Sequence, residues 1–352
     1  MRVLLTGAAG FIGGHIRTAL LEVGHEVVAV DVLLSSAHGD PATAPEAVQR
    51  LDVRDDEAMD LTLRGVDVVC HQAAVVGAGV DANDAPAYAS HNDYGTAVLL
   101  AAMHRAGCRR LVLASSMVVY GDGQYRCERH GTVEPLPRAE SDLRDGQFDH
   151  RCPIGGEPVM WERVSESAAL RPRSLYAASK LAQEHFALAW SLGTGGSVTA
   201  LRYHNVYGGR MPRDTPYSGV AAMFRSSLES GEAPHVYEDG DQTRDFVHVA
   251  DVAAANVKSI ETETAGFSPF NVCSGQPVTI GQVASRLAES RNGPSPIVTG
   301  KYRPGDVRHI VADPTRAGEV LGFTAAITPG DGLEAFAWAP LRDVVPTGPP
   351  RV

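Results

Sequence analysis

The residues Val3-Leu-Leu-Thr6-Gly7-Ala-Ala-Gly10-Phe-Ile-Gly13 decide the fold of this chain. A short apolar run ends at Thr6, three glycines follow at intervals of three, and a helical pattern continues to Val23. The first glycine permits a tight turn, Gly10 lets the backbone approach a pyrophosphate, and Gly13 lets the helix pack closely on the strand. Free N–H groups at the helix start then face the diphosphate. This stretch predicts a dinucleotide-binding strand–turn–helix unit.

The residues at the ends of the next predicted strands indicate which cofactor binds. Asp31 closes the predicted strand Glu26–Asp31, where an acid accepts hydrogen bonds from the adenosine ribose and repels a 2′-phosphate. NAD is therefore favoured over NADP. The carboxylate of Asp52–Val53 can reach the adenine amino group, and the small pair Ala73–Ala74 leaves room for a ribose. His71 is expected to be a packed strand-end residue and not a catalyst.

Short β-branched runs alternate with helical patterns along the first half, which is typical of a parallel sheet covered by helices. The predicted strands are Val3–Thr6, Glu26–Asp31, Val48–Asp52, Val66–His71, Arg110–Ser115 and Val198–Tyr203, and the predicted helices are Gly13–Val23, Ala87–Ala106 and Ser174–Ser191. The later pattern is mixed, with helices Val220–Ser230 and Asp251–Glu261 and a strand pair near 235–249. We therefore predict an α/β fold, a Rossmann-type doubly wound parallel sheet with a smaller mixed α/β C-terminal substrate lobe.

Length indicates two lobes, because 352 residues exceed the roughly 250–300 at which one hydrophobic core stops growing. We expect an NAD-binding domain over 1–206 and a substrate lobe over 207–340, with 235–260 returning to the first domain. Residues 121–172 interrupt the alternating pattern and are interpreted as an insertion near the active site. The Pro-rich stretch 341–352 is expected to be a tail.

Charge and cysteine content exclude several classes of protein. The net charge of −11, from 31 basic and 42 acidic residues, argues against nucleic-acid binding, because phosphate contacts need clustered Lys and Arg. No apolar run approaches the ~18 residues of a membrane helix, so no membrane contact is expected. The five cysteines are scattered and odd in number, which is typical of a reduced cytoplasmic chain.

Tyr176-Ala-Ala-Ser-Lys180 predicts a catalytic group, because it places a phenol and an ammonium on one helix face. A free tyrosine has a pKa of about 10 and is a poor base at neutral pH. The nearby ammonium, together with a positive nicotinamide ring, favours the phenolate. Tyr176 can then remove a hydroxyl proton while the adjacent carbon gives hydride to the cofactor. Ser116, at a strand end before Tyr120-Gly121, can share that proton.

Together these residues resemble the extended short-chain dehydrogenase/reductase family, the NAD-dependent epimerases and dehydratases of nucleotide sugars. The resemblance covers nearly the whole chain, from Thr6 to Asp306. Further matching stretches are Asn92-Asp-Tyr-Gly-Thr96, Leu201-Arg-Tyr-His-Asn-Val-Tyr-Gly208, Asp241-Gln-Thr-Arg-Asp-Phe-Val-His-Val249 and Arg303-Pro-Gly-Asp306.

The resemblance implies a role for each matching position. The catalytic trio is Ser116, Tyr176 and Lys180. Implied NAD contacts are Gly7, Gly10, Phe11, Ile12, Gly13, Asp31, Asp52, Val53, Ala73, Ala74, Asn92, Tyr176, Lys180 and Tyr203, with His204 also bordering the nicotinamide. Implied substrate contacts are Ser116, Asn205, Arg210, Arg213, Val220, Arg244, Arg303 and Asp306. Of these, Arg244 and Arg303 clamp the diphosphate, which suits planar guanidinium groups, and Asp306 accepts ribose hydroxyls.

Departures from the family pattern select the reaction. The sugar 4,6-dehydratases carry Asp-Glu immediately after the position of Ser116, whereas this chain has Met117 and Val118, which transfer no protons. Keto-sugar reductases usually favour NADP, against which Asp31 argues. The remaining reaction is 4-epimerisation through a transient 4-keto sugar, with cofactor regenerated in each cycle. A non-catalytic NAD-binding sensor or scaffold is the alternative of another class, disfavoured because Tyr176 and Lys180 are both present.

The loop Gly208–Val220 is expected to set the sugar. Arg210 or Arg213 can bind a C6 carboxylate, as in uronic acid 4-epimerases, so a UDP-hexose or UDP-glucuronate is the favoured substrate. Either arginine can equally bind phosphate or pair with Asp214. The alternative substrate is a dTDP-6-deoxyhexose of the dTDP-L-rhamnose type, because epimerases of that class resemble this chain in the insertion.

Two expectations concern metal and assembly. The insertion holds Cys127-x2-His130 and Cys152-Pro-Ile-Gly155, but a zinc ribbon has a fourth ligand where this chain has Gly155. No metal is therefore expected, although His150 or a water would complete a site. The alanine-rich patterns Ala87–Ala106 and Ser174–Ser191 predict a homodimer, because these helices often form the dimer interface in relatives.

Overall fold

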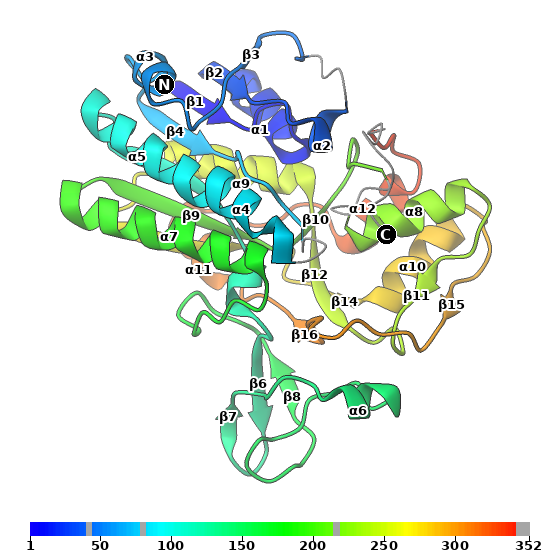
Figure 1. Cartoon of the computed structure of the whole chain (residues 1–352). Coiled ribbons are helices and arrows are strands. Elements are labelled where there is room, and N and C mark those ends of the chain that lie inside the picture. Colours follow the sequence, from blue (N-terminus) through cyan, green and yellow to red (C-terminus); the bar gives the residue numbers. More distant parts are fainter. Residues whose placement is uncertain (40–43, 78–81, 214–218, 343–352) are drawn as a thin grey trace.

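The computed structural model describes residues 1–39, 44–77, 82–213 and 219–342, which are built around a seven-stranded sheet (Figure 1). Its strands are β1 (Arg2–Thr6), β2 (Glu26–Asp31), β3 (Val48–Arg50), β4 (Val68–His71), β5 (Arg110–Ser116), β9 (Ser197–Tyr203) and β13 (Phe267–Val272). Their order is β13-β9-β5-β4-β1-β2-β3, and every neighbouring pair is parallel. The six predicted strands are confirmed to within two residues, and so is the Rossmann-type fold.

Helices cover both faces of this sheet. One face packs on α1 (Phe11–Glu22), α9 (Val249–Glu261) and α11 (Thr315–Leu321), and the other on α3 (Asp56–Thr62), α5 (Gly95–Ala106) and α7 (Leu175–Thr194). The strands are buried on both sides, which explains their continuous apolar runs. Shorter elements of this body are α2 (Ser35–His38), η1 (Ala82–Asp84), α4 (Ala85–Tyr88), η2 (Ala89–Tyr94) and η3 (Met117–Tyr120).

The seventh strand, β13, was not predicted. Its sequence contains Pro269, and proline cannot donate a ladder hydrogen bond, so it weakens the strand signal. The structure places β13 at the edge of the sheet, where proline is tolerated. The chain thus returns from the second lobe to the large sheet through α9 and β13, beyond the expected 235–260.

The second lobe is mixed α/β, as predicted, and lies beside the carboxyl ends of β5 and β9 (Figure 1). Its strands are β10 (Asn205–Tyr207), β11 (His235–Val236), β12 (Thr243–His248), β14 (Pro277–Thr279), β15 (Ile297–Val298) and β16 (His309–Ile310), and its helices are α8 (Val220–Glu229), α10 (Ile280–Ser290) and α12 (Pro329–Phe336). The two strands expected near 235–249 are present as β11 and β12, but they do not pair with each other. β11 pairs with β15, whereas β12 pairs with β10, β14 and β16, because a turn at Gly240 redirects the chain.

The insertion, residues 121–172, projects from the body below both lobes (Figure 1). It forms a three-stranded antiparallel sheet, β7-β6-β8, from β6 (Gln124–Cys127), β7 (Gly131–Val133) and β8 (Met160–Glu162), with a short helix α6 (Glu140–Arg144). These elements are too short to produce a readable periodicity. In the described part of the chain no helix is both long and apolar enough to cross a membrane.

Candidate active site

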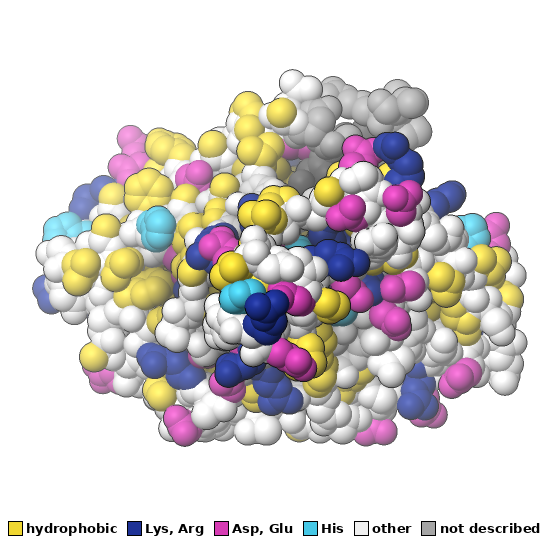
Figure 2. All heavy atoms as spheres, turned by 90° about the horizontal axis from the view of Figure 1, so that it is seen from below, with side chains coloured by type: hydrophobic (Ala, Val, Ile, Leu, Met, Phe, Trp, Pro, Cys, Tyr) yellow, Lys and Arg dark blue, Asp and Glu magenta, His cyan; other side chains and the backbone are white. Residues whose placement is uncertain are grey.

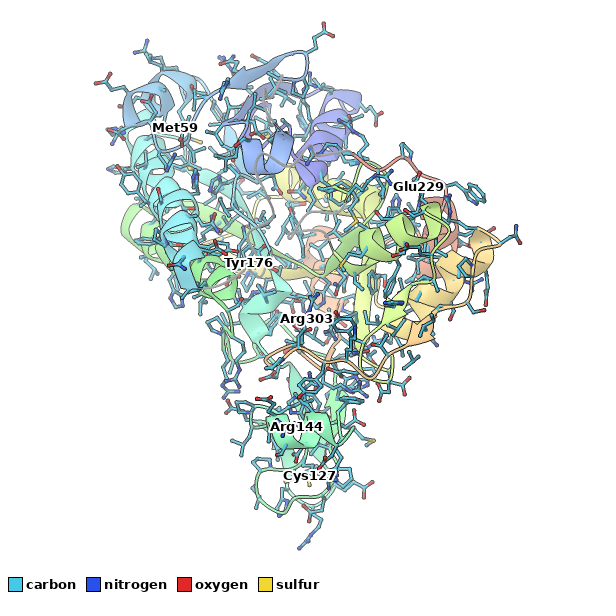
Figure 3. All side chains as sticks on the ribbon, turned by 45° about the vertical axis from the view of Figure 1, so that its right-hand side comes forward. Met59, Cys127, Arg144, Tyr176, Glu229 and Arg303 are labelled. Carbon is cyan, nitrogen blue, oxygen red and sulfur yellow. The ribbon has the colours of Figure 1, made fainter. Side chains whose placement is uncertain are left out.

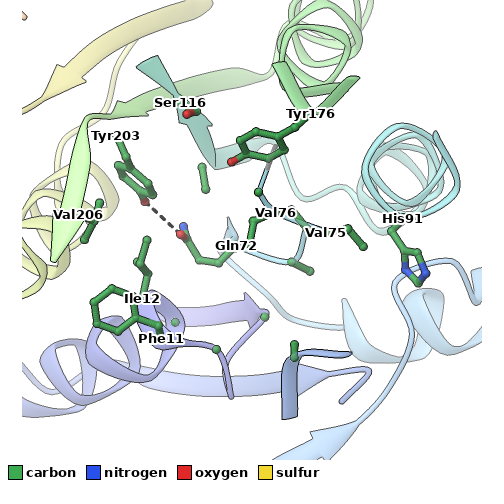
Figure 4. A pocket seen from close by; sticks show the side chains of 18 of the residues that line it. Phe11, Ile12, Gln72, Val75, Val76, His91, Ser116, Tyr176, Tyr203 and Val206 are labelled. Carbon is green, nitrogen blue, oxygen red and sulfur yellow. Dashed lines mark hydrogen bonds between the residues drawn. The ribbon is translucent and has the colours of Figure 1, made fainter. Parts of the chain in front are cut away.

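The glycine turn after β1 has the close contacts that its sequence predicts. Gly7 has a φ of +68°, and a Cβ there would lie 2.7 Å from the Ala73 nitrogen. A Cβ on Gly13 would lie 2.0 Å from the Gly7 oxygen, so the first turn of α1 sits against the backbone. Beside this turn is a cavity of about 540 Å³ between the two lobes (Figure 4). The glycines, Phe11 and Ile12 line it, as predicted.

Asp31 lies at the cavity edge and orders its own loop. Its carboxylate accepts hydrogen bonds from the Ala9 nitrogen at 3.0 Å and the Leu33 nitrogen at 2.8 Å. Two basic residues that sequence reasoning missed stand nearby, because His38 Nε2 lies 3.6 Å from Asp31 Oδ1 and Arg342 also lines the cavity. Both neighbours come from segments without a recognisable motif.

The segment 341–352, which was expected to be a tail, has near its beginning a residue that binds the body, Arg342. Its guanidinium donates to the Ala9 oxygen at 3.0 Å, and its backbone pairs with the loop at Met211 and Arg213. These backbone hydrogen bonds hold the beginning of the Pro-rich segment against the body. Residues 343–352 lie outside the described part of the chain.

The other predicted NAD contacts also line the cavity, with one exception. Asp52, Val53, Ala73 and Ala74 all face it. A bidentate ion pair with Arg54, with Nη2–Oδ2 at 2.6 Å, lowers the pKa of Asp52. Asn92 does not line the cavity. It is fully buried in the π-helical η2, and its amide binds both backbone groups of Val75, at 2.7 and 2.9 Å, and Ser179 Oγ. Asn92 therefore positions the loop after β4.

The catalytic helix begins where a serine caps it. Ser174 Oγ accepts a hydrogen bond from the Ala177 nitrogen at 3.1 Å, which starts α7 just before Tyr176. One turn later, Lys180 Nζ lies 6.0 Å from the Tyr176 ring centroid and donates to the Ala114 oxygen at 2.9 Å. Ser116, at the end of β5, lines the cavity together with Tyr176 and acts to lower the pKa of that phenol. The predicted trio is thus brought together at one wall of the cavity (Figure 4).

Burial changes the protonation of this trio. It raises the pKa of Tyr176 to about 12, although the neighbouring Ser116 opposes this shift. It lowers the pKa of Lys180 to about 8, although Glu184 and Asp93 oppose this shift. The protein groups alone therefore leave Tyr176 a neutral phenol at pH 7. The expectation that Lys180 favours the phenolate needs the positive charge of the nicotinamide ring.

A buried polar network of side chains connects the end of β5 with α7 and β9. Glu184 forms an ion pair with Arg202, with Oε2–Nη2 at 2.7 Å, and also accepts from the Ser115 hydroxyl. Arg202 donates to the Tyr120 hydroxyl at 3.0 Å, which explains the tyrosine of the strand-end motif. Tyr120 is thus a supporting residue. His71 is also structural, as predicted, because both ring nitrogens bind buried threonines, Thr6 and Thr96.

At the end of β9 the chain lines the opposite wall of the cavity. The Tyr203 hydroxyl binds Gln72 and Asn256, each at 3.1 Å, so Tyr203 forms a fixed surface (Figure 4). His204 and Asn205 also line the cavity, and burial lowers the pKa of His204 to about 3. Both His204 ring nitrogens and Asn205 Oδ1 are buried without a hydrogen-bond partner among the described residues. Such buried polar atoms indicate a ligand that binds them.

The predicted diphosphate clamp forms a separate cluster beside the cavity. Arg244 is half-buried and donates to the backbone oxygens of Thr243, Val307 and Arg308. Burial lowers its pKa to about 10, while Asp306 opposes the shift. Arg303 packs over the Tyr237 ring at 5.2 Å and also lies near Asp306. In Figure 3, Arg303 and Tyr176 both point toward the space between the lobes.

The structure does not bring the predicted sugar-loop residues to the cavity. Arg213 forms an ion pair with Glu229, and Val220 packs in the core of the second lobe. Arg210 is exposed, has a φ of +66°, and its guanidinium lies 3.9 Å from the Cβ position of Gly14. Asp214, the other partner considered for these arginines, lies outside the described residues.

This site fits NAD. The glycine turn leaves space that side chains would fill, Asp31 stands where an adenosine ribose would lie, and unpaired polar atoms face the cavity at its other end. Seen from below, basic and acidic side chains are interspersed over the surface without a large patch of one sign (Figure 2). This face therefore lacks the clustered Lys and Arg side chains that a nucleic-acid-binding surface carries.

Comparison with known proteins agrees with this site. The model of the NAD-dependent epimerase/dehydratase family matches residues 3–141 and 153–273. The dTDP-L-rhamnose 4-epimerase of Burkholderia thailandensis is 34% identical over 332 residues, covering 92% of this chain and 90% of that protein. The UDP-glucose 4-epimerase of Mycolicibacterium smegmatis is 30% identical over 341 residues, covering 95% and 96%.

Solved structures are similar over nearly the whole chain. MoeE5 in complex with UDP-glucuronic acid and NAD superposes with a TM-score of 0.76 at 31% identity, covering 96% of this chain and 98% of that one. The UDP-glucose 4-epimerase of Thermotoga maritima, with UDP-glucose, gives 0.78 at 28% identity, covering 96% and 97%. The family match leaves out 142–152, inside the insertion. By its sequence, its fold and its cofactor site, this chain belongs to the NAD-dependent epimerase/dehydratase family.

Proposed function

We propose that this chain is an NAD-dependent 4-epimerase of nucleoside-diphosphate sugars, acting through a transient 4-keto intermediate. The observation that carries the proposal is the composition of the catalytic wall. Tyr176 and Ser116 both line the cavity there, and the adjacent wall residues Met117 and Val118 carry no transferable proton. One acid–base hydroxyl is sufficient to oxidise and reduce C4, whereas dehydration needs further proton-transfer groups.

The chain's own residues act on the C4 hydroxyl. Tyr176 takes its proton as C4 is oxidised and returns it to the epimerised sugar. Ser116, which lines the same wall, orients the hydroxyl and then the carbonyl. Lys180, held by the Ala114 oxygen, keeps a positive charge beside the phenol below pH 8. NAD supplies the reversible hydride acceptor at C4 and the positive ring that lowers the pKa of Tyr176.

UDP-hexose and UDP-glucuronate are the first substrates to consider. Support comes from relatives, because MoeE5 was solved with UDP-glucuronic acid and several similar proteins are UDP-glucose 4-epimerases. We place the diphosphate near Arg244 and Arg303, which form a positive cluster between the lobes, with Asp306 beside them. Asn205 Oδ1, buried and unpaired, is positioned to bind the ligand.

A dTDP-6-deoxyhexose is the second candidate, and one observation favours it. Val75, Val76, Met117 and Val118 give the cavity an apolar wall near Tyr176, which suits a C6 methyl group (Figure 4). Among the described lining residues the Lys and Arg side chains are Lys180, which binds Ala114, and Arg342, which lies near Asp31. Neither is available for a C6 carboxylate. A relative at 34% identity is a dTDP-L-rhamnose 4-epimerase.

The test is incubation of the purified chain with UDP-glucose, UDP-glucuronate and a dTDP-6-deoxyhexose, followed by chromatography for the C4 epimer. Epimer formation from one member identifies the substrate. A folded protein that binds NAD but converts no member would instead support the sensor or scaffold function.

We further propose a cytoplasmic homodimer. Exposed apolar side chains on adjacent helices support the dimer, namely Tyr94 of η2 and Phe186, Leu188 and Leu192 of α7, of which Leu192 is 79% exposed. α5 and α7 lie side by side on one face of the body (Figure 1). Light scattering at micromolar concentration tests this, and a monomeric mass would contradict it.

A further inference from the structure

Four potential metal ligands meet at the outer end of the insertion, far from the catalytic wall (Figure 3). They are Cys127, His130, Cys152 and Glu157, and their ligand atoms all lie within 4.8 Å of one another. His130 Nδ1 lies 3.5 Å from Cys127 Sγ, 3.3 Å from Cys152 Sγ and 3.9 Å from Glu157 Oε2. Bond lengths of about 2.0–2.3 Å around tetrahedral zinc place its ligand atoms roughly 3.3–3.8 Å apart. The three distances from His130 lie in or within 0.1 Å of this range, and the whole group is compact enough for small side-chain movements to close it around one tetrahedral ion.

Two hairpin turns supply these ligands in pairs. Cys127 ends β6 and pairs in register with Gly131, whose φ of +71° closes the turn that carries His130. Cys152 and Glu157 flank the second turn, in which the Cys152 nitrogen donates to the Glu157 oxygen at 2.7 Å. Each turn thus presents two ligands toward the other turn. The four ligands are brought together by these two turns and not by contacts with the main body.

The fourth ligand is the one that the sequence argument missed. The expectation of no metal relied on Gly155, because a ribbon motif has its last ligand there. A Cβ on Gly155 would lie 2.2 Å from Glu157 Oε2, so this carboxylate already occupies the space beside position 155. Arg129 donates to the other oxygen, Oε1, at 2.7 Å and so fixes the carboxylate. His150, considered earlier as a ligand, instead packs edge-on against Tyr125.

A second, independent observation points to an ion. Glu157 Oε2 is buried and has no hydrogen-bond partner among the described residues. Both thiols are free and buried, with Cys127 1% and Cys152 3% exposed. Two sulfurs, an imidazole and a buried carboxylate oxygen make a donor set that suits zinc and not the hard ions calcium or magnesium.

The outer part of the insertion needs an additional stabilising element such as a metal ion. Its core consists of four buried residues, Tyr125, Cys127, Val133 and Cys152, with Val159 and Trp161 packed beside them. A core this small does not stabilise a three-stranded sheet unaided, and small domains commonly add a metal or disulfides. Yet the base of the insertion carries Arg138, which binds Glu238 at 2.8 Å, and Asp149, which binds Arg308 at 2.7 Å. The insertion is therefore an ordered part of the molecule.

We propose that the insertion binds one structural Zn²⁺ through Cys127, His130, Cys152 and Glu157. Four protein ligands close the coordination sphere, so the ion has no open position for substrate. Its role is to hold the outer end of the insertion while the base contacts the lobe that carries Arg244 and Asp306.

The experiment is elemental analysis of the full chain, purified without a histidine tag or chelator from zinc-supplemented cells. We expect about one zinc per chain in the wild type and less than a tenth of that in Cys127→Ser and Cys152→Ser. The matched control is Cys108→Ser, which alters a buried thiol of the main body and should keep its zinc. Replacement by cobalt should give the visible and charge-transfer bands of a tetrahedral thiolate site.

Variants of the fourth ligand sharpen the test. Glu157→Gln should release zinc to a chelator at least tenfold faster, whereas Glu162→Gln, on β8 and paired with Gln124 and Arg126, should not. The double variant Gly155→Cys/Glu157→Ala should restore slow release, because it exchanges the carboxylate for a thiolate. Protease cleavage confined to 121–172 after chelation would show that the ion orders the insertion. Wild-type protein without zinc, zinc unaffected by Cys127→Ser, or a Cys127–Cys152 disulfide would overturn the proposal.

Discussion

The cofactor side and the sugar side of this active site are built in different ways. On the cofactor side, 13 of the 14 predicted residues line one cavity, and the remaining one, Asn92, anchors the loop that borders it. On the sugar side, Ser116 and Asn205 face the cavity, while Arg244, Arg303 and Asp306 cluster outside it and Arg210, Arg213 and Val220 lie elsewhere. The cofactor side is preformed around a glycine turn with close backbone contacts, whereas the predicted diphosphate contacts of the sugar side are the side chains of Arg244 on β12 and Arg303 in the loop before β16.

The largest expected effect is on the catalytic wall that joins the two sides. Tyr176→Phe removes the acid–base hydroxyl and leaves the ring, so kcat should fall by about 10²–10⁴ while bound NAD stays near the wild-type amount. Lys180→Ala should be at least as damaging, because it removes the positive charge beside the phenol. Steady-state kinetics with bound-NAD analysis provide the measurement. Near wild-type turnover by Tyr176→Phe would contradict the mechanism.

The second prediction concerns the preformed cofactor side. In Gly13→Ala the new methyl group would lie 2.0 Å from the Gly7 oxygen, and the backbone must shift. Overpacking of this kind costs about 1–3 kcal/mol, so NAD affinity should fall by about 10–100-fold. The neighbouring Gly14→Ala is the control, since its nearest contact would be at 3.9 Å. Calorimetric titration of both apoproteins with NAD would separate them, and equal affinities would contradict the close-contact argument.

These two regions also show what could be predicted from sequence. The glycine turn, Asp31 and the tyrosine–lysine pair act through local backbone geometry, which short motifs encode. Asn92 and Arg342 act through tertiary contacts with Val75 and Ala9, which no local pattern reports. The proline in β13 weakened the sequence signal for that strand. The strands of the insertion are too short to show a periodicity, so their sheet was not predicted. Glu157 was missed as a ligand because its carboxylate reaches the space beside position 155, although it lies two residues away in the sequence.

A third prediction compares two arginines of the sugar side. Arg244→Lys loses the planar group held by three backbone oxygens near Asp306, so KM for the nucleotide sugar should rise about tenfold. Arg213→Lys, at the ion pair with Glu229, should change KM less than twofold. The KM values of both variants are measured from initial rates over a range of substrate concentrations. A larger effect at Arg213 would return that arginine to the substrate site.

The smallest predicted effect is a dependence of rate on pH. Burial lowers the pKa of Lys180 from its ordinary value of 10.5 to about 8, so its positive charge is present below pH 8 and lost above it. Without that charge the Tyr176 phenolate is disfavoured, and kcat should fall about fivefold between pH 8 and pH 9. A buffer series with constant ionic strength gives the profile. A rate that stays level to pH 10 would show that the ammonium does not titrate in this range.

The most direct test of the proposed reaction follows the hydrogen on C4. A nucleotide sugar that the chain converts, labelled with deuterium at C4, is incubated with protein that carries its own NAD and receives no other reductant. If hydride leaves C4 and returns to the opposite face, mass spectrometry and NMR should find the C4 epimer with deuterium still at C4. An epimer whose C4 deuterium has exchanged with water would contradict the account.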